Sequence, residues 1–209
     1  VLNSCIGKSD TLILSVKPKP TLTAVSNQTY CANVNTSQIN FGSVPSSGTT
    51  HAWTNSNSSI GLPVTGSGNV PTFLTSNAGN TPIVSTINVT PTLNGCNGNT
   101  LPFTITVNPI PILSAIPNQT FCAGNIVPAS NFASNIVGTT FSWTNDNPSI
   151  GMIATGVGNY VLFTATNTGS SASVGNFKVT PTANTCVGST QNFTITVNQN
   201  LQPLVLSSS

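Results

Sequence analysis

The sequence predicts an all-β fold, in which β-sandwich domains follow one another as tandem repeats in a rod. Three observations lead to this prediction: a nearly uncharged composition, an internal repeat, and strand-like alternation of apolar and polar residues within each repeat. Charged residues make up only 3% of the 209 residues, whereas about a quarter is usual in a soluble domain. Threonine, valine and isoleucine, which favour strands, are abundant. A disordered chain is therefore not expected.

The chain repeats its own sequence at a spacing of 90 or 91 residues. The segment Phe103–Asn108 recurs unchanged as Phe193–Asn198. The other matching segments are Asn27–Cys31 with Asn118–Cys122, Trp53–Asn55 with Trp143–Asn145, Ser59–Gly61 with Ser149–Gly151, Gly66–Asn69 with Gly156–Asn159, and Val89–Thr92 with Val179–Thr182. A repeat of about 90 residues is an ordinary size for one sandwich domain.

The two ends of the chain fit the same register. Cys5–Gly7 and Leu12–Val16 align with Cys96–Gly98 and Phe103–Val107. We therefore expect residues 1–16 to be the C-terminal strand of a preceding repeat, residues 17–108 and 109–198 to be two complete repeats, and residues 199–209 to begin a next repeat or a linker. The start of the chain lacks the pattern of a signal peptide, so export signals are expected outside this chain.

Each repeat carries the signals of short strands joined by turns. Phe103, Ile105 and Val107 alternate with threonines, which gives one apolar face and one hydroxyl face. Residues 93–98 predict a hairpin because they contain Asn-Gly turns, and residues 66–69 predict a further turn. Prolines at 18, 20, 109 and 111 predict a stiff, extended approach to each domain. About seven such strands, without a helical pattern, indicate an immunoglobulin-like sandwich.

Five cysteines in such a chain predict disulfide bonds. The simplest pairing lies within repeats, Cys31 with Cys96 and Cys122 with Cys186. Each bond would close a loop of about 65 residues, worth roughly 4 kcal/mol in the chain-entropy model. Cys5 is then expected to pair outside this chain. The alternative is five free thiols; zinc binding is not expected because there is no Cys-x-x-Cys motif or Cys/His cluster.

The scarcity of acids and bases argues against an enzyme, and we predict no catalytic, cofactor-binding or metal-binding residue. Asp10 and Asp146 belong to different repeats, so neither repeat has a carboxylate pair for glycoside hydrolysis or the acids that calcium needs. His51, the single histidine, corresponds to Phe141, so a packing role is expected. Trp53 and Trp143 are expected to fill the cores. Four scattered lysines form no basic patch, so nucleic acid is not an expected partner.

Taken together, the motifs Asn-Gln-Thr-x-Cys, Trp-Thr-Asn-x-Asn-x-Ser-Ile-Gly, Gly-x-Gly-Asn, Val-Thr-Pro-Thr and Phe-Thr-Ile-Thr-Val-Asn resemble the PKD-like repeats of giant bacterial cell-surface adhesins. The similarity is greatest to gliding-motility adhesins exported by the type IX secretion system. The resemblance implies an extracellular, non-catalytic, cell-surface filament that mediates attachment and gliding. It also marks Thr11, within Asp10-Thr-Leu12, as a candidate O-glycosylation site, because that triplet resembles the acceptor of related secreted proteins.

The partners expected from this resemblance are neighbouring repeats of the same polypeptide, with surface polysaccharide or other filaments as further candidates. Membrane insertion is not expected because no run of 18 apolar residues exists. Two other functions stay open. A carbohydrate-binding immunoglobulin-like module of a secreted multidomain protein would need exposed aromatic side chains, and self-assembly would need unprotected edge strands.

Overall fold

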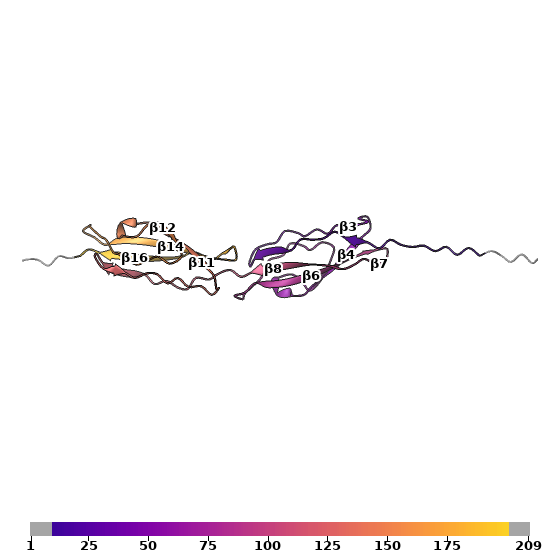
Figure 1. The fold of residues 1–209 in the computed structure, drawn as a ribbon, viewed down its shortest axis with the longest axis horizontal. Coiled ribbons are helices and arrows are strands. Elements are labelled where there is room, and N and C mark those ends of the chain that lie inside the picture. Colours follow the sequence, from indigo (N-terminus) through magenta and orange to yellow (C-terminus); the bar gives the residue numbers. More distant parts are fainter. Residues whose placement is uncertain (1–9, 201–209) are drawn as a thin grey trace, which may run out of the picture.

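The computed structural model describes residues 10–200, and these form two β-sandwich domains placed end to end (Figure 1). Residues 1–9 and 201–209 lie outside the described residues, so the partner of Cys5 stays a prediction. Leu12–Val16 forms no strand within the described part of the chain, and its side chains are exposed. A strand needs hydrogen-bonding neighbours, and neither domain supplies them to this segment.

The first domain contains one large sheet and one short pair of strands. The large sheet has the order β2-β8-β6-β4-β5, and β7 extends β6 by a hairpin. The strands are β1 (Thr21–Leu22), β2 (Gln28–Cys31), β3 (Ser43–Val44), β4 (Thr50–Asn55), β5 (Thr65–Ser67), β6 (Ile83–Leu93), β7 (Cys96–Asn97) and β8 (Leu101–Asn108), with a 3-10 turn η1 (Ser58–Ile60) between β4 and β5. β1 pairs with β3.

The second domain repeats this arrangement with the sheet order β12-β11-β14-β16-β9. Its strands are β9 (Gln119–Cys122), β10 (Ile126–Val127), β11 (Thr140–Asn145), β12 (Thr155–Val157), β13 (Phe163–Thr164), β14 (Ser173–Ala183), β15 (Cys186–Val187) and β16 (Gln191–Asn198), with the turn η2 (Pro148–Ile150). The predicted hairpins are present: Leu93 pairs with Cys96 across a two-residue Asn-Gly turn, and Ala183 pairs with Cys186 in the second copy. Both domains are immunoglobulin-like β-sandwiches, as predicted.

The first strand of each large sheet runs parallel to the last strand. β2 pairs with β8 so that Cys31 lies opposite Asn108, whereas the remaining pairs in this sheet are antiparallel. β9 and β16 repeat the pairing, with Cys122 opposite Asn198. Each of these cysteines therefore lies at the pole of the domain where the last strand ends.

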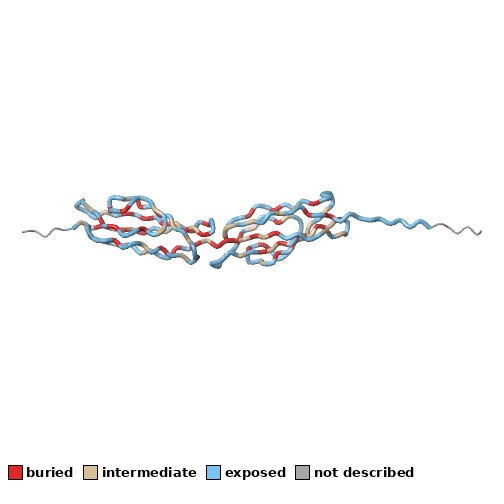
Figure 2. Tube along the Cα trace, viewed as in Figure 1, coloured by how far each residue is buried: buried red, intermediate tan, exposed pale blue. Residues whose placement is uncertain are grey.

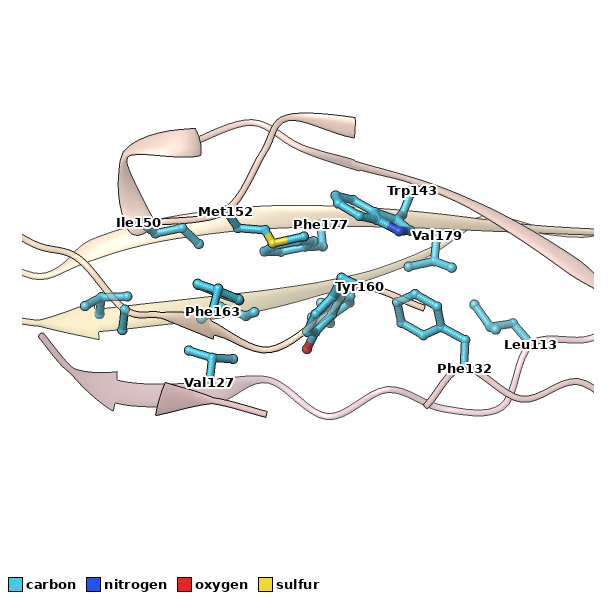
Figure 3. Close-up of a cluster of buried hydrophobic side chains, with 14 residues drawn as sticks. Leu113, Val127, Phe132, Trp143, Ile150, Met152, Tyr160, Phe163, Phe177 and Val179 are labelled. Carbon is cyan, nitrogen blue, oxygen red and sulfur yellow. The ribbon is translucent and has the colours of Figure 1, made fainter. Parts of the chain in front are cut away.

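Alternating side chains fill the core of each sandwich, and Figure 2 shows the buried residues following the strands through both domains. In β8, Phe103, Ile105 and Val107 point inward, as the threonine alternation predicts. In the second domain Phe177 and Phe193 stack with ring centroids 4.8 Å apart. Trp143 lies over Phe177 and Tyr160 in the same cluster (Figure 3).

The two tryptophans explain the glycines of the Gly-x-Gly-Asn motif. Gly66 lies in β5 opposite Trp53, and a Cβ there would come within 2.0 Å of the indole. Gly156 has the same relation to Trp143, at 2.2 Å. The expected turn at residues 66–69 is thus partly wrong, since its first glycine belongs to a strand. Gly68, with φ of +69°, does turn the chain.

Several asparagine side chains form hydrogen bonds to backbone groups of the strands. Asn27 Oδ1 accepts a hydrogen bond from the Thr104 amide at 2.8 Å, and Asn118 Oδ1 does the same for Thr194. Asn77 Nδ2 donates to the carbonyl of Val107 at 2.8 Å. Such side chains bond to backbone groups that would otherwise need water or a partner strand, which gives the abundant asparagine of this uncharged chain a structural role.

Candidate functional site: the junction between the domains

The junction between the two domains is closed by a disulfide bond. Cys31, the last residue of β2, is bonded to Cys186, the first residue of β15, with the Cα atoms 5.6 Å apart. Cys96 and Cys122, the other cysteines among residues 10–200, are free. This corrects the expected pairing, because neither Cys31–Cys96 nor Cys122–Cys186 is formed. The bond joins the repeats instead of closing each one.

The strand arrangement explains why a bond within one repeat cannot form. Cys31 lies beside Asn108, at the end of β8, whereas Cys96 lies in the hairpin that precedes Leu101. At about 3.3 Å per residue, β8 separates the two ends by about 23 Å. A disulfide requires Cα atoms within about 7 Å. Cys31 and Cys96 therefore lie at opposite poles of the first domain.

Asparagine side chains add hydrogen bonds across the same junction. Asn108 Nδ2 donates to the carbonyl oxygen of Asn184, in the turn before Cys186, at 3.2 Å. Asn108 is only 7% exposed, so this amide is largely shielded from water. Asn135 Nδ2 donates to Asn80 Oδ1 at 2.8 Å. Because these bonds come from different segments of both domains, they oppose rotation about the linker.

The linker itself is fixed on both sides. Ile110 packs against the core of the first domain, and Leu113 lies in the core of the second. Gly188 touches the linker so closely that a Cβ there would lie 2.1 Å from the carbonyl oxygen of Pro111. Pro109 and Pro111 have fixed φ angles. Linker, hydrogen bonds and disulfide together hold the second domain in line with the first (Figure 1).

The pKa values of three titratable side chains are shifted by packing and by hydrogen bonds within the fold. His51 packs against Phe41 at 5.5 Å, and its Nε2 lies 3.2 Å from Ser43 Oγ. Burial lowers the pKa of His51. The Asp146 carboxylate accepts hydrogen bonds from the backbone and side-chain amides of Asn176, both at 2.8 Å, and these bonds lower its pKa. Burial raises the pKa of Tyr160, because it disfavours the charged phenolate.

The remaining predicted residues lie as follows. Trp53 and Trp143 are each 4% exposed and belong to the two hydrophobic cores. Asp10 and Thr11 are exposed, in the segment that precedes the first domain. Within residues 10–200, no three histidine, cysteine, aspartate or glutamate side chains gather as they would around a metal ion. The same part of the chain holds no helix with the length and apolarity to cross a bilayer.

Comparison with known proteins finds a family match over the second domain. Residues 119–201 match the PKD-like domain family. This match covers β9 to β16 and so begins at the strand that carries Cys122. No curated protein matches the chain.

Solved structures that contain tandem domains are similar to the chain at low sequence identity. The Sidekick-1 immunoglobulin domains 1–4 are 14% identical, with a TM-score of 0.46 over 86% of this chain and 48% of that one. Mouse cadherin-23 EC22–24 is 10% identical, with a TM-score of 0.43 over 87% and 67%. Human mucin-like protocadherin EC1–2 is 9% identical, with a TM-score of 0.40 over 87% and 98%.

Proposed function

We propose that this chain is a structural, non-catalytic segment of a long extracellular surface adhesin or filament. The observation that carries the proposal is the Cys31–Cys186 bond, because it joins successive repeats and so fixes their relative direction. Repeats that are held in line in this way form an extended rod, and such a rod would hold a binding domain at its end away from the cell. Disulfide bonds persist mainly in oxidising compartments, which supports an extracellular location.

The finer proposal is a bacterial adhesin of the gliding-motility type, exported by type IX secretion. Its support is the set of repeat motifs, together with the PKD-like match over residues 119–201. The repeat boundaries 17–108 and 109–198 belong to the same proposal. The exposed segment Leu12–Val16 supports it further, because the side chains of Leu12, Leu14 and Val16 are at least 83% exposed while their counterparts in β8 are buried. A preceding repeat would cover them. Surface polysaccharide and other filaments are the proposed contacts of the assembled protein.

The carbohydrate-binding alternative needs an aromatic surface for stacking on a sugar ring. Trp53 and Trp143 are the natural candidates, but each is 4% exposed and faces a core. Neither indole offers a free face to a ligand. A spacer role fits these side chains better than a sugar-binding role.

The test separates spacing from binding in the cells that make the protein. Residues 17–198 are either deleted or replaced by two unrelated immunoglobulin-like domains of the same total length, and attachment to glass and gliding speed are measured. We expect the deletion to weaken attachment and the replacement to restore it. If the replacement fails to restore attachment although the protein reaches the surface, the segment is a binding module. Labelling of intact cells with an antibody against this segment checks the location.

A further inference from the structure

We propose that Cys96 and Cys122 each form a disulfide bond with a cysteine of another repeat. This proposal rests on the proposed role of the chain as part of a repeat array. Cys122 would bond to the hairpin cysteine of the repeat that follows, and Cys96 to the first-strand cysteine of the repeat that precedes. In each repeat, the first-strand cysteine then bonds to the following repeat and the hairpin cysteine to the preceding repeat. The bond Cys31–Cys186 is the completed form of this junction.

Cys122 has the same position in the second domain as Cys31 has in the first. Cys31 ends β2 opposite Asn108, and Cys122 ends β9 opposite Asn198. The next residue makes the same hydrogen bond in both copies: the Ala32 amide donates to the Asn108 carbonyl at 2.8 Å, and the Ala123 amide donates to Asn198 at 2.9 Å. Cys122 is exposed at this pole, so its thiol is accessible to a partner.

Cys96 likewise has the position of Cys186. Each begins a two-residue strand directly after an Asn-led turn, and Asn94 and Asn184 share a φ of 48°. Cys186 is 1% exposed in its bond to the neighbouring domain, whereas unbonded Cys96 is partly exposed. This difference in exposure is what we expect between a hairpin cysteine that is bonded to a neighbouring domain and one that has no neighbouring domain beside it.

The segment before the first domain contacts the hairpin of Cys96 in the same way as the linker contacts the hairpin of Cys186. Lys17, which aligns with Asn108, donates from Nζ to the carbonyl oxygen of Asn94 at 3.0 Å. Asn108 donates to the equivalent carbonyl of Asn184. A Cβ on Gly98 would lie 2.1 Å from the Pro20 carbonyl oxygen, which repeats the contact of Gly188 with Pro111. Three features of the closed junction therefore recur beside Cys96: the linker path, the hydrogen bond and the tight glycine.

Cys96 and Cys122 cannot pair with each other in one chain. Cys96 begins β7, at the N-terminal end of the rod, and Cys122 lies beside the end of β16 at the other end (Figure 1). Each proposed bond forms from two thiols by thiol–disulfide exchange with a disulfide-bonded oxidant. The two thiol protons and two electrons pass to that oxidant, which leaves as two thiols.

The test extends the chain by one repeat. Residues 1–198 are followed by a second copy of residues 109–198, in which Cys122→Ser removes the terminal thiol and Val187→Ile gives the hairpin peptide a distinct mass. Val187 is 61% exposed, so this change is tolerated. The protein is refolded with oxidised and reduced glutathione, remaining thiols are alkylated, and disulfide-linked peptides are identified by mass spectrometry.

We expect Cys122 to be linked to the mass-tagged hairpin peptide, and Cys31 to the untagged one. A matched control with Cys186→Ser in the appended copy should leave Cys122 alkylated without changing the Cys31 bond. Alkylated Cys122 in the extended chain, or a bond from Cys122 to the untagged peptide, would overturn the inference. Resistance of all three tryptophans to acrylamide quenching verifies that the appended copy has folded.

A second measurement needs no refolding. Protein extracted from the source cells with thiols blocked is digested and mapped without reduction. The inference predicts that Cys96 and Cys122 are each linked to a peptide from another repeat, and free or mutually bonded thiols contradict it. Loss of Cys31–Cys186 in the same map would instead contradict the array proposed above, so the two ideas fail separately.

Discussion

Replacing Cys186 with serine should convert one joint unfolding transition into two separate ones. When one domain unfolds alone, the folded domain still holds its own cysteine beside the linker, so the bond closes a loop of about 80 residues. In the chain-entropy model this opposes the unfolding of either domain by about 4.5 kcal/mol. When both unfold together, the loop spans the full separation of 155 residues, and its closure stabilises the pair by only about 5 kcal/mol in total.

The bond therefore adds nearly all of its stabilisation to the free energy of unfolding the first domain. It adds almost nothing to the free energy of then unfolding the second. The intact chain should melt as a unit, and Cys186→Ser should lower the midpoint of that melting by about 10–20 °C. Differential scanning calorimetry measures the transitions, and hydrogen exchange read by mass spectrometry assigns each one to a domain. Cys122→Ser is the matched control, since that thiol is exposed and free, and it should melt like the parent. A Cys186→Ser protein that keeps one transition within about 2 °C of the parent would refute the reasoning.

Three further predictions concern the cores and the charges. Gly156→Ala should destabilise the second domain by about 1–3 kcal/mol, because its Cβ overlaps the Trp143 ring. Urea unfolding measures this, and Gly169→Ala should be nearly neutral, because its Cβ would meet Asn167 Oδ1 at 3.4 Å and the Ser171 carbonyl oxygen at 4.0 Å, both ordinary contacts. Burial lowers the pKa of His51 in the folded state, so the unfolded state binds more protons and the first domain should lose stability as the pH falls below about 6.5. His51→Phe, which copies Phe141, should remove that loss, and an unchanged pH profile would contradict the assignment. Finally, with 3% charged residues, the melting temperature should hardly change between about 0.01 M and 1 M sodium chloride, over which the Debye length falls from about 30 Å to 3 Å; a large shift would show that charges matter more than proposed.

The fold was largely predictable because its signals are local. The threonine alternation of residues 103–107 predicts which face of β8 is buried, and the Asn-Gly pair at 94–95 predicts the hairpin. The turn at residues 66–69 was only half right, since the reason for Gly66 is contact with Trp53 from another strand. Such a contact depends on the sheet order, which local patterns do not contain.

The disulfide was mispredicted for a related reason. Equal loop lengths made pairing within each repeat look simplest, but the parallel pairing of β2 with β8 carries Cys31 to the far pole. One signal was present in the sequence. Eleven residues separate Pro20 from Cys31, as they separate Pro111 from Cys122, and at about 3.3 Å each such a segment spans about 36 Å. That is enough to cross a domain, so the first cysteine of a repeat belongs near the next repeat.

The Cys31–Cys186 bond also determines how the two domains respond to tension along the rod. Without it, pulling the segment before β2 away from the end of β8 would draw these two parallel strands past each other lengthwise. Because Cys31 ties the end of β2 to the second domain, β2 and β8 are both held at the junction and cannot slide. The hydrogen bonds between residues 28–31 and 105–108 are thereby protected from shear. The two domains are joined by two covalent connections, the linker and the disulfide, and a cut in the linker alone would leave the rod in one piece.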